Sequence, residues 1–115
     1  DNRDKINIEE ANSQKYGLDF LLALQPKVFQ MKPRQRYIGI ENDGSKADAF
    51  KTLGFIAQEV AQVQEQFEDD ASQCVNQTNP IQLRLSTNFM PMIVNAFKQL
   101  VARIEALEAQ IDYTA

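Results

Sequence analysis

The C-terminal stretch of the chain has an apolar residue at alternating intervals of three and four positions, and this repeat constrains the fold more than any other feature. The repeat consists of Met90, Ile93, Phe97, Leu100, Ile104, Leu107 and Ile111. Over three heptads, such spacing places the apolar side chains along one seam of a helix. We therefore predict an oligomerisation helix in residues 86–115, capped by Ser86 or Thr87 and running to about Asp112.

Two kinds of packing fit this seam. The helix can be amphipathic and pack on its own domain, or it can form a coiled coil with identical chains. In the last turns, polar residues such as Arg103 and Glu108 flank a narrow seam, which favours the coiled coil. The predicted oligomer interface comprises Ile93, Phe97, Leu100, Ile104, Leu107 and Ile111.

The heptads leave the number of helices in the bundle open. Isoleucine at the first apolar position with leucine at the second favours two helices. Phe97 at a first position, and an early stripe widened by Val94 and Val101, favour more than two.

The whole chain of 115 residues is predicted to form one α+β domain, with a globular part in residues 1–85. We predict a small antiparallel sheet, two short helices and the long terminal helix. The predicted segments are an extended arm or short strand over 1–12, a helix from Ser13 to Leu24, a hairpin of strands 27–31 and 36–40, a strand over 52–56, a helix over 57–67, a loop over 68–80 and a strand over 81–85.

Composition excludes several classes of function. The net charge of −4 argues against nucleic-acid binding, which needs a concentrated basic face. Cys74 is the only cysteine and there is no histidine, which excludes an internal disulfide, Ser-His-Asp catalysis and most zinc sites. We interpret Cys74 as structural. No apolar run approaches the roughly 20 residues of a membrane span, and we expect no metal, no cofactor and no membrane partner.

The segment Gly54–Val60 joins a predicted strand to a predicted helix. Gly54 permits a close approach that a Cβ atom would prevent, and the next two residues are apolar. Gln58 and Glu59 open the helix, where a carboxylate interacts favourably with the positive end of the helix dipole. The segment is thus interpreted as a corner of the core, and Gln58 or Glu59 is in addition a candidate for contact with a functional site.

Several segments, in their order along the chain, resemble the C-terminal intramolecular chaperone domain of phage tailspikes, tail fibres and endosialidases, which releases itself by serine peptidase chemistry. These segments are Asp1 with Lys5 and Ile8, Leu18–Leu24 with Pro26–Phe29, Gly54–Val60, Leu83–Phe89, and Pro91–Leu100. The resemblance covers nearly the whole chain, and Gly54–Val60 is its most specific part. The chain departs from the family pattern at Gln64-Glu65, where the family often has a proline, and at Asn88-Phe89, where it often has Asp-Tyr.

The resemblance implies self-cleavage between a serine and an aspartate, helped by a lysine four residues after that aspartate. Asp1 and Lys5 have this spacing, which implies that the chain is the released product and that the nucleophilic serine lies on the upstream part. It also implies a homotrimer that guides the folding of the upstream fibre or spike of the same polypeptide. Such a domain acts in the host cytoplasm during phage assembly and is absent from the mature virion.

A lysine is the reasonable base for a serine nucleophile in a chain without histidine. A free lysine has a pKa of about 10.4, whereas a working base needs about 7–8. This difference takes roughly 4 kcal/mol of desolvation or like charge. A packed site in an assembled oligomer can supply it, so we predict that cleavage is gated by assembly. The alternatives are that Lys5 is an ordinary surface lysine, that the chain is a permanent oligomerisation or host-attachment module, and that it is an unrelated coiled-coil adaptor.

Overall fold

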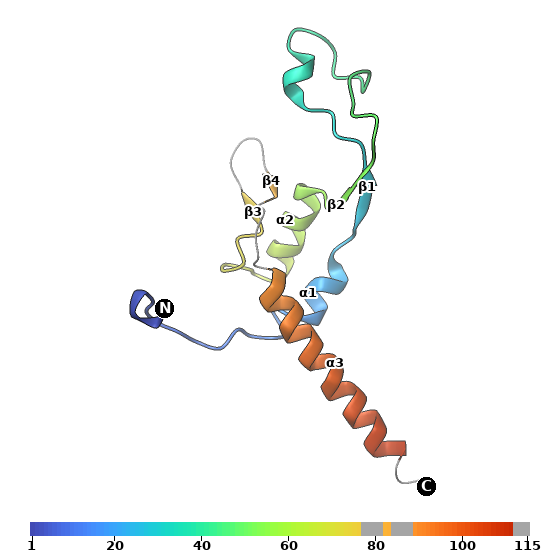
Figure 1. The fold of residues 1–115 in the computed structure, drawn as a ribbon. Helices are drawn as coiled ribbons and strands as arrows, with labels where there is room; N and C mark the ends of the chain where they lie inside the picture. The colour runs from blue at the N-terminus through green and yellow to red at the C-terminus, as the bar shows by residue number, and fades with distance from the viewer. Residues whose placement is uncertain (77–81, 84–88, 112–115) are drawn as a thin grey trace.

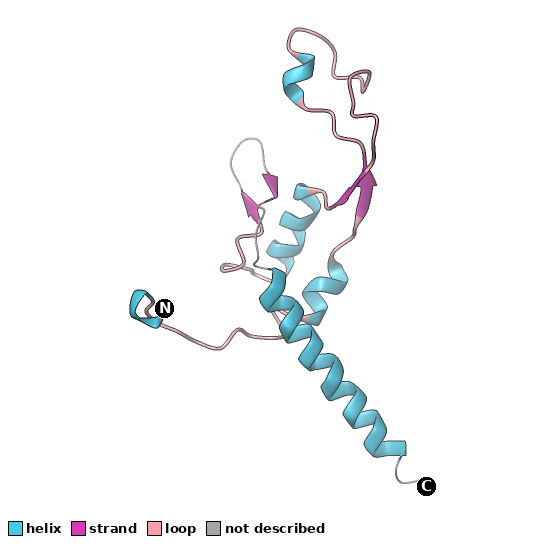
Figure 2. Ribbon diagram, in the orientation of Figure 1, coloured by secondary structure: helices cyan, strands magenta, loops and turns pink. Residues whose placement is uncertain are grey.

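The computed structural model describes residues 1–76, 82–83 and 89–111, and it confirms the predicted α+β fold class (Figures 1 and 2). Two small antiparallel sheets, short helices and one long C-terminal helix follow one another along the chain. The elements are η1 (Asn2–Asp4), α1 (Leu18–Ala23), β1 (Lys27–Phe29), η2 (Arg34–Tyr37), β2 (Thr52–Gly54), α2 (Ala57–Gln66), β3 (Val75–Asn76), β4 (Gln82–Leu83) and α3 (Phe89–Ile111).

The first sheet pairs β1 with β2, with Val28 opposite Leu53. The predicted pairing of strands 27–31 and 36–40 is therefore wrong, because the second of these segments begins inside the 3₁₀ helix η2 and continues as a turn. Pro33, which has no N–H to donate to a strand, precedes η2. The Tyr37 side chain is buried, and its hydroxyl accepts a hydrogen bond of 2.8 Å from the Lys46 N–H. These interactions fold the segment into the long connection between β1 and β2.

Helix α1 is shorter than predicted, because it begins at Leu18 rather than after Ser13. The preceding residues form a turn in which the N–H of Tyr16 donates to the carbonyl of Asn12 at 2.7 Å. Gly17 is not helical, and a Cβ atom there would collide with the Ser13 carbonyl and with Gln99 Oε1. The start of α1 is thus determined by contact with α3. The helix propensities of the residues in this segment do not reveal such a contact.

Helix α2 confirms the helix predicted over 57–67 to within one residue. Strand β2 is shorter than predicted, because Phe55 and Ile56 already lead into α2. The segment predicted as a loop over 68–80 contains β3, which pairs with β4. Of the strand predicted over 81–85, only β4 is described, and the predicted caps of the terminal helix, Ser86 and Thr87, lie outside the described residues.

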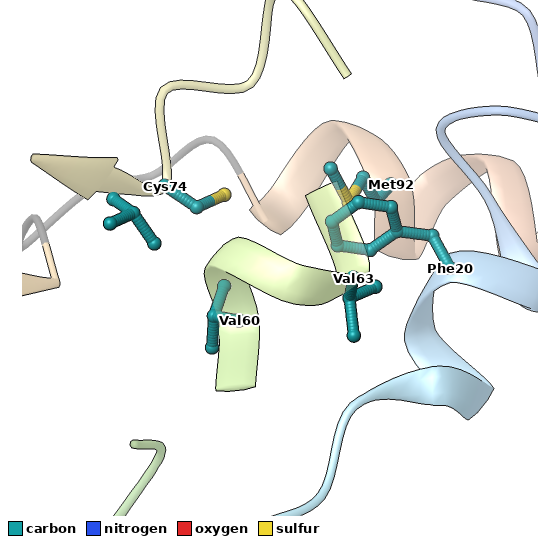
Figure 3. Packing of buried hydrophobic residues seen from close by; sticks show 6 residues of the cluster. Phe20, Val60, Val63, Cys74 and Met92 are labelled. Atoms are coloured by element: carbon teal, nitrogen blue, oxygen red, sulfur yellow. The ribbon is translucent and has the colours of Figure 1, made fainter. Parts of the chain in front are cut away.

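The core lies where α1, α2, β3 and the first turns of α3 meet (Figure 3). It consists of Phe20, Val60, Val63, Cys74, Val75 and Met92. The ring of Phe20 also packs at 5.5 Å, centroid to centroid, on the ring of Phe67 at the end of α2. Cys74 is free and completely buried, and burial raises the pKa of its thiol. This position agrees with the structural role predicted for Cys74.

The chain is far more extended than a compact domain. Its radius of gyration is 19.6 Å and its extents are 69 × 43 × 25 Å, whereas about 13 Å is typical for a compact domain of this length. The N-terminal arm, the β1–β2 hairpin and α3 point away from the core in three directions (Figure 1). Much of the apolar surface on these projections therefore has no covering within the chain itself.

Candidate functional site

The first five residues form a small structured unit at the tip of the N-terminal arm. The Asp1 carboxylate caps η1 by accepting a hydrogen bond of 2.9 Å from the Arg3 N–H, and it pairs with the Arg3 guanidinium at 2.5 Å. The turn of η1 brings Lys5 back over Asp1, so that Lys5 Nζ lies 3.2 Å from the Asp1 carbonyl oxygen. The two residues singled out by their spacing are therefore in direct contact.

The arm between this unit and the body is exposed. Ile6 is 85% exposed and Ile8 is 69% exposed, although both are large apolar side chains. In the described part of the chain, no hydrogen bond or ion pair ties residues 6–11 to the core. The arm leads to a root at Lys15–Leu18, where the chain enters α1 (Figure 1).

Asp70 holds one side of this root. Its carboxylate accepts a hydrogen bond of 2.7 Å from the Tyr16 hydroxyl and lies 3.4 Å from Lys15 Nζ. These two donors, the hydroxyl first, lower the pKa of the Asp70 carboxyl. Beside them is an open groove of about 560 Å³, lined by Glu9, Glu10, Ala11, Asn12, Lys15, Tyr16, Asp70, Ala71, Ser72, Pro91 and Met92.

Two side-chain amides of α3 hold the other side of the root. Asn95 Nδ2 donates a hydrogen bond of 2.8 Å to the Tyr16 carbonyl oxygen, and Gln99 Oε1 accepts one of 2.8 Å from the Leu18 N–H. The second bond satisfies a main-chain N–H that the first turn of a helix leaves without a partner. We call this pair of contacts the amide latch. The sequence pattern did not predict these contacts, and the local signal for them is Gly17, which lies between the two bonded residues.

Asp69 closes the turn that follows α2. Its carboxylate accepts hydrogen bonds from the Ser72 hydroxyl, from the Ser72 N–H at 2.9 Å and from Gln64 Nε2 at 3.0 Å. Burial raises the pKa of this carboxyl, but the hydrogen bonds from Ser72, Gln64 and Ala71 outweigh that effect, so the pKa of Asp69 lies below its ordinary value of 3.8.

Acid is expected to weaken the fold through Asp69. Because the pKa of Asp69 is lower in the folded state, its contribution to stability is present above pH 3.8 and is lost as the pH falls through the folded pKa. Below about pH 4, the free energy of unfolding should therefore fall less steeply with decreasing pH in Asp69→Asn than in the parent. Chemical denaturation at fixed protein concentration measures the free energy of unfolding at each pH. The control is Asp4→Asn, a substitution in the exposed arm. An unchanged slope in Asp69→Asn would contradict the assignment.

Gln58 and Glu59 lie at the start of α2, away from the tip of the arm (Figure 1). Glu59 Oε1 is 3.7 Å from Lys27 Nζ on β1, and Gln58 is exposed. In the described residues, no hydrogen bond or ion pair joins either side chain to Asp1 or Lys5. A single chain therefore does not bring these residues to the predicted cleavage site.

The apolar seam of α3 lies on a different face from the one that packs on the core. Met92 and Ala96 are buried, and Asn95 and Gln99 form the amide latch on the same side of the helix. The predicted interface residues are exposed, from 44% for Leu100 to 68% for Phe97. This set comprises Ile93, Phe97, Leu100, Ile104, Leu107 and Ile111. The core of one chain thus leaves the seam uncovered.

The described ranges contain neither a metal-binding cluster nor a membrane-spanning helix. No group of three or more His, Cys, Asp or Glu side chains is placed to hold a metal ion there. In the same ranges, no helix has both the length and the apolar character that crossing a membrane requires.

Comparison with known proteins gives one family. A peptidase family model described as "Chaperone of endosialidase" matches residues 1–80, which is well over half of the chain. The match includes Asp1, Lys5 and the whole of α2, whereas α3 lies beyond it. No curated protein matches the chain.

Proposed function

Because the chain belongs to the family described as the chaperone of endosialidase, and so has a chaperone role, we propose that it is a self-releasing trimerisation chaperone. Three copies associate through α3 and align the upstream fibre or spike segments of their own polypeptides. The chaperone then separates by cutting the peptide bond before Asp1. This sequence of events takes place in the host cytoplasm during phage assembly, and the released domain is absent from the mature virion.

The exposed seam of α3 is the observation that carries the proposal. Seven apolar side chains in heptad spacing are 44 to 68% exposed along a helix whose other face is already packed on the core. Burial of such a seam between helices is the main favourable term in coiled-coil formation. Phe97 at a first apolar position, with Val94 and Val101 widening the early stripe, favours more than two helices. We favour three because the family that the chain resembles serves trimeric fibres and spikes.

Alignment by α3 addresses a kinetic difficulty of fibre folding. Structures rich in contacts between distant residues fold slowly, because the entropy of loop closure is lost before the contacts form. A bundle that joins three chains raises their effective concentration and sets them in a common register. A clamp of this kind is needed only until the fibre has folded, which is consistent with its later removal.

The contact between Lys5 and Asp1 supports the proposed route of cleavage. We assign Lys5 as the base that takes the proton of an upstream serine hydroxyl and delivers it to the departing amine of Asp1. The serine oxygen bonds to the carbonyl carbon of the Ser–Asp peptide bond, and the C–N bond to Asp1 breaks. One water then hydrolyses the serine ester, so that the products are a new carboxyl end, the free serine hydroxyl and the Asp1 amine. Lys5 Nζ lies 3.2 Å from the Asp1 carbonyl, one residue beyond the scissile bond.

Assembly is proposed to switch this chemistry on. Lys5 is exposed in the single chain, so water solvates its side-chain nitrogen. A neighbouring chain or the folded fibre that covers the arm would remove this solvation. Gln58 or Glu59 of a neighbouring chain can enter the site at that stage, although the single chain keeps them apart from Lys5.

The test uses the full polypeptide, extended upstream through the last segment of the fibre. Its native mass gives the number of chains, and a denaturing gel with intact mass gives the cut. The proposal expects a trimer and a fragment that begins at Asp1. A stable trimer that stays whole would instead identify a permanent oligomerisation module, and a monomer would refute the trimerisation chaperone.

A further inference from the structure

The amide latch joins the root of the arm to the helix that carries the seam. Its two bonds link Tyr16 and Leu18 to Asn95 and Gln99, about eighty positions away in the sequence. Asn95 and Gln99 are one helical turn apart on α3, and Gln99 is followed directly by Leu100 of the seam. The latch thus lies between the surface proposed for assembly and the segment that leads to Lys5.

The chemistry of the two contacts fixes the orientation of each amide. The Tyr16 carbonyl can only accept a hydrogen bond, so Asn95 must present its NH₂ group. The Leu18 N–H can only donate, so Gln99 must present its oxygen. The two positions therefore have opposite requirements, a donor at residue 95 and an acceptor at residue 99.

The close approach at Gly17 shows that the latch is tightly fitted. A Cβ atom at position 17 would overlap Gln99 Oε1 on one side and the Ser13 carbonyl on the other. Position 17 must therefore be glycine if Gln99 is to reach the Leu18 N–H. On the opposite side, the Tyr16 hydroxyl is held by Asp70, so the root is clamped from two directions.

We propose that Asn95 and Gln99 are positioning residues for self-cleavage. By clamping the root, they transmit the placement of α3 in the bundle to the exposed arm and so to Lys5. The inference rests on the proposed function, because it concerns the same cleavage. It adds that assembly reaches the cleavage site through the main chain at Tyr16 and Leu18, as well as by covering Lys5.

Three substitutions in the full upstream-extended polypeptide separate this role from a general effect of charge or size. Asn95→Asp replaces the donor by an acceptor, whereas Gln99→Glu keeps the acceptor and Gln99→Met removes it. Asn95→Asp and Gln99→Glu add the same charge to the same face of α3. If the added charge matters, Asn95→Asp and Gln99→Glu should change the cleavage rate alike. If the latch matters, Asn95→Asp should slow cleavage as Gln99→Met does, and Gln99→Glu should not.

We expect all three variants to stay trimeric by native mass. Cleavage of Asn95→Asp and Gln99→Met should be at least about tenfold slower than in the parent, as misplacement of a reacting group commonly causes, and Gln99→Glu should cut at the parent rate. Hydrogen exchange at the Leu18 amide supplies an independent readout, faster in Gln99→Met and unchanged in Gln99→Glu.

Several results would overturn the inference. These are parental cleavage rates in Asn95→Asp and Gln99→Met, a Gln99→Glu variant as slow as Gln99→Met, or loss of the trimer in the slow variants, which would make the role merely structural. Failure of the inference is distinguishable from failure of the proposed function. If the parent cuts and the variants cut equally well, only the inference fails, whereas a parent that never cuts removes both.

Discussion

A Lys5→Met variant of the upstream-extended polypeptide is expected to assemble normally and to remain uncut. Methionine keeps an unbranched side chain of similar length but has no amine, so it cannot take the proton of the serine. Removal of a general base typically lowers a rate by about 10²–10⁴-fold. The measurement is the fraction of the Asp1 fragment against time on a denaturing gel, with intact mass and native mass to show the cut and the trimer.

Two further variants sharpen this result. Lys32→Met is a matched control, because Lys32 is also an exposed lysine whose Nζ donates to a main-chain carbonyl, that of Asn42 at 3.4 Å. It should cut at the parent rate. Lys5→Arg keeps the positive charge and the donor but stays protonated, so it should also remain uncut. Cleavage in Lys5→Arg would show that a positive charge, rather than a base, is required at this position.

The elements with strong apolar periodicity were predictable from the sequence. Helix α3 shows heptad spacing over three heptads, and α2 was located to within one residue because Val60 and Val63 share a buried face. In α2 the pattern that defines the helix is also the pattern that packs, so local and tertiary preferences agree. In α3 the heptad seam defines the helix, although a different face, with Met92 and Ala96, packs on the core.

The elements that depend on distant partners were not predictable in the same way. Residues 36–40 alternate like a strand, but β1 pairs with β2 across a long connection, and the buried Tyr37 holds the intervening segment in another form. The start of α1 is set by Gln99 of α3. Alternation along a short segment does not say which strand it will join, and helix propensity does not register a cap from eighty residues away.

In the candidate site, too, contacts between neighbouring residues were easier to predict than contacts between distant ones. Asp1 and Lys5, which the resemblance singled out by their spacing, are four positions apart, so a single turn such as η1 brings them together without distant partners. The amide latch joins residues from opposite ends of the chain, and neither an asparagine nor a glutamine on a helix carries a distinguishing local signal. Gln58 and Glu59 were placed correctly on a helix, and in the described residues of the single chain no hydrogen bond or ion pair joins them to Lys5.

Leu100→Asp is expected to dissociate the trimer and to abolish self-cleavage with it. In the single chain Leu100 is 44% exposed on the seam, so the monomer tolerates the carboxylate. In the bundle, three carboxylates would meet at one level of the seam, and burial of an unpaired charge costs several kcal/mol per ion. A cost of that size should lower the association constant of the trimer by more than about 10³-fold. Sedimentation equilibrium measures this constant.

The matched control for this substitution is Ala102→Asp. It places the same charge on the same helix at an exposed position that is outside the apolar repeat. Circular dichroism should show helix in both variants, while only Leu100→Asp becomes monomeric and stays uncut. A Leu100→Asp variant that remains trimeric would show that the seam does not join the chains. A monomeric variant that still releases the Asp1 fragment would show that Lys5 acts without assembly, because its activation would then come from the single chain.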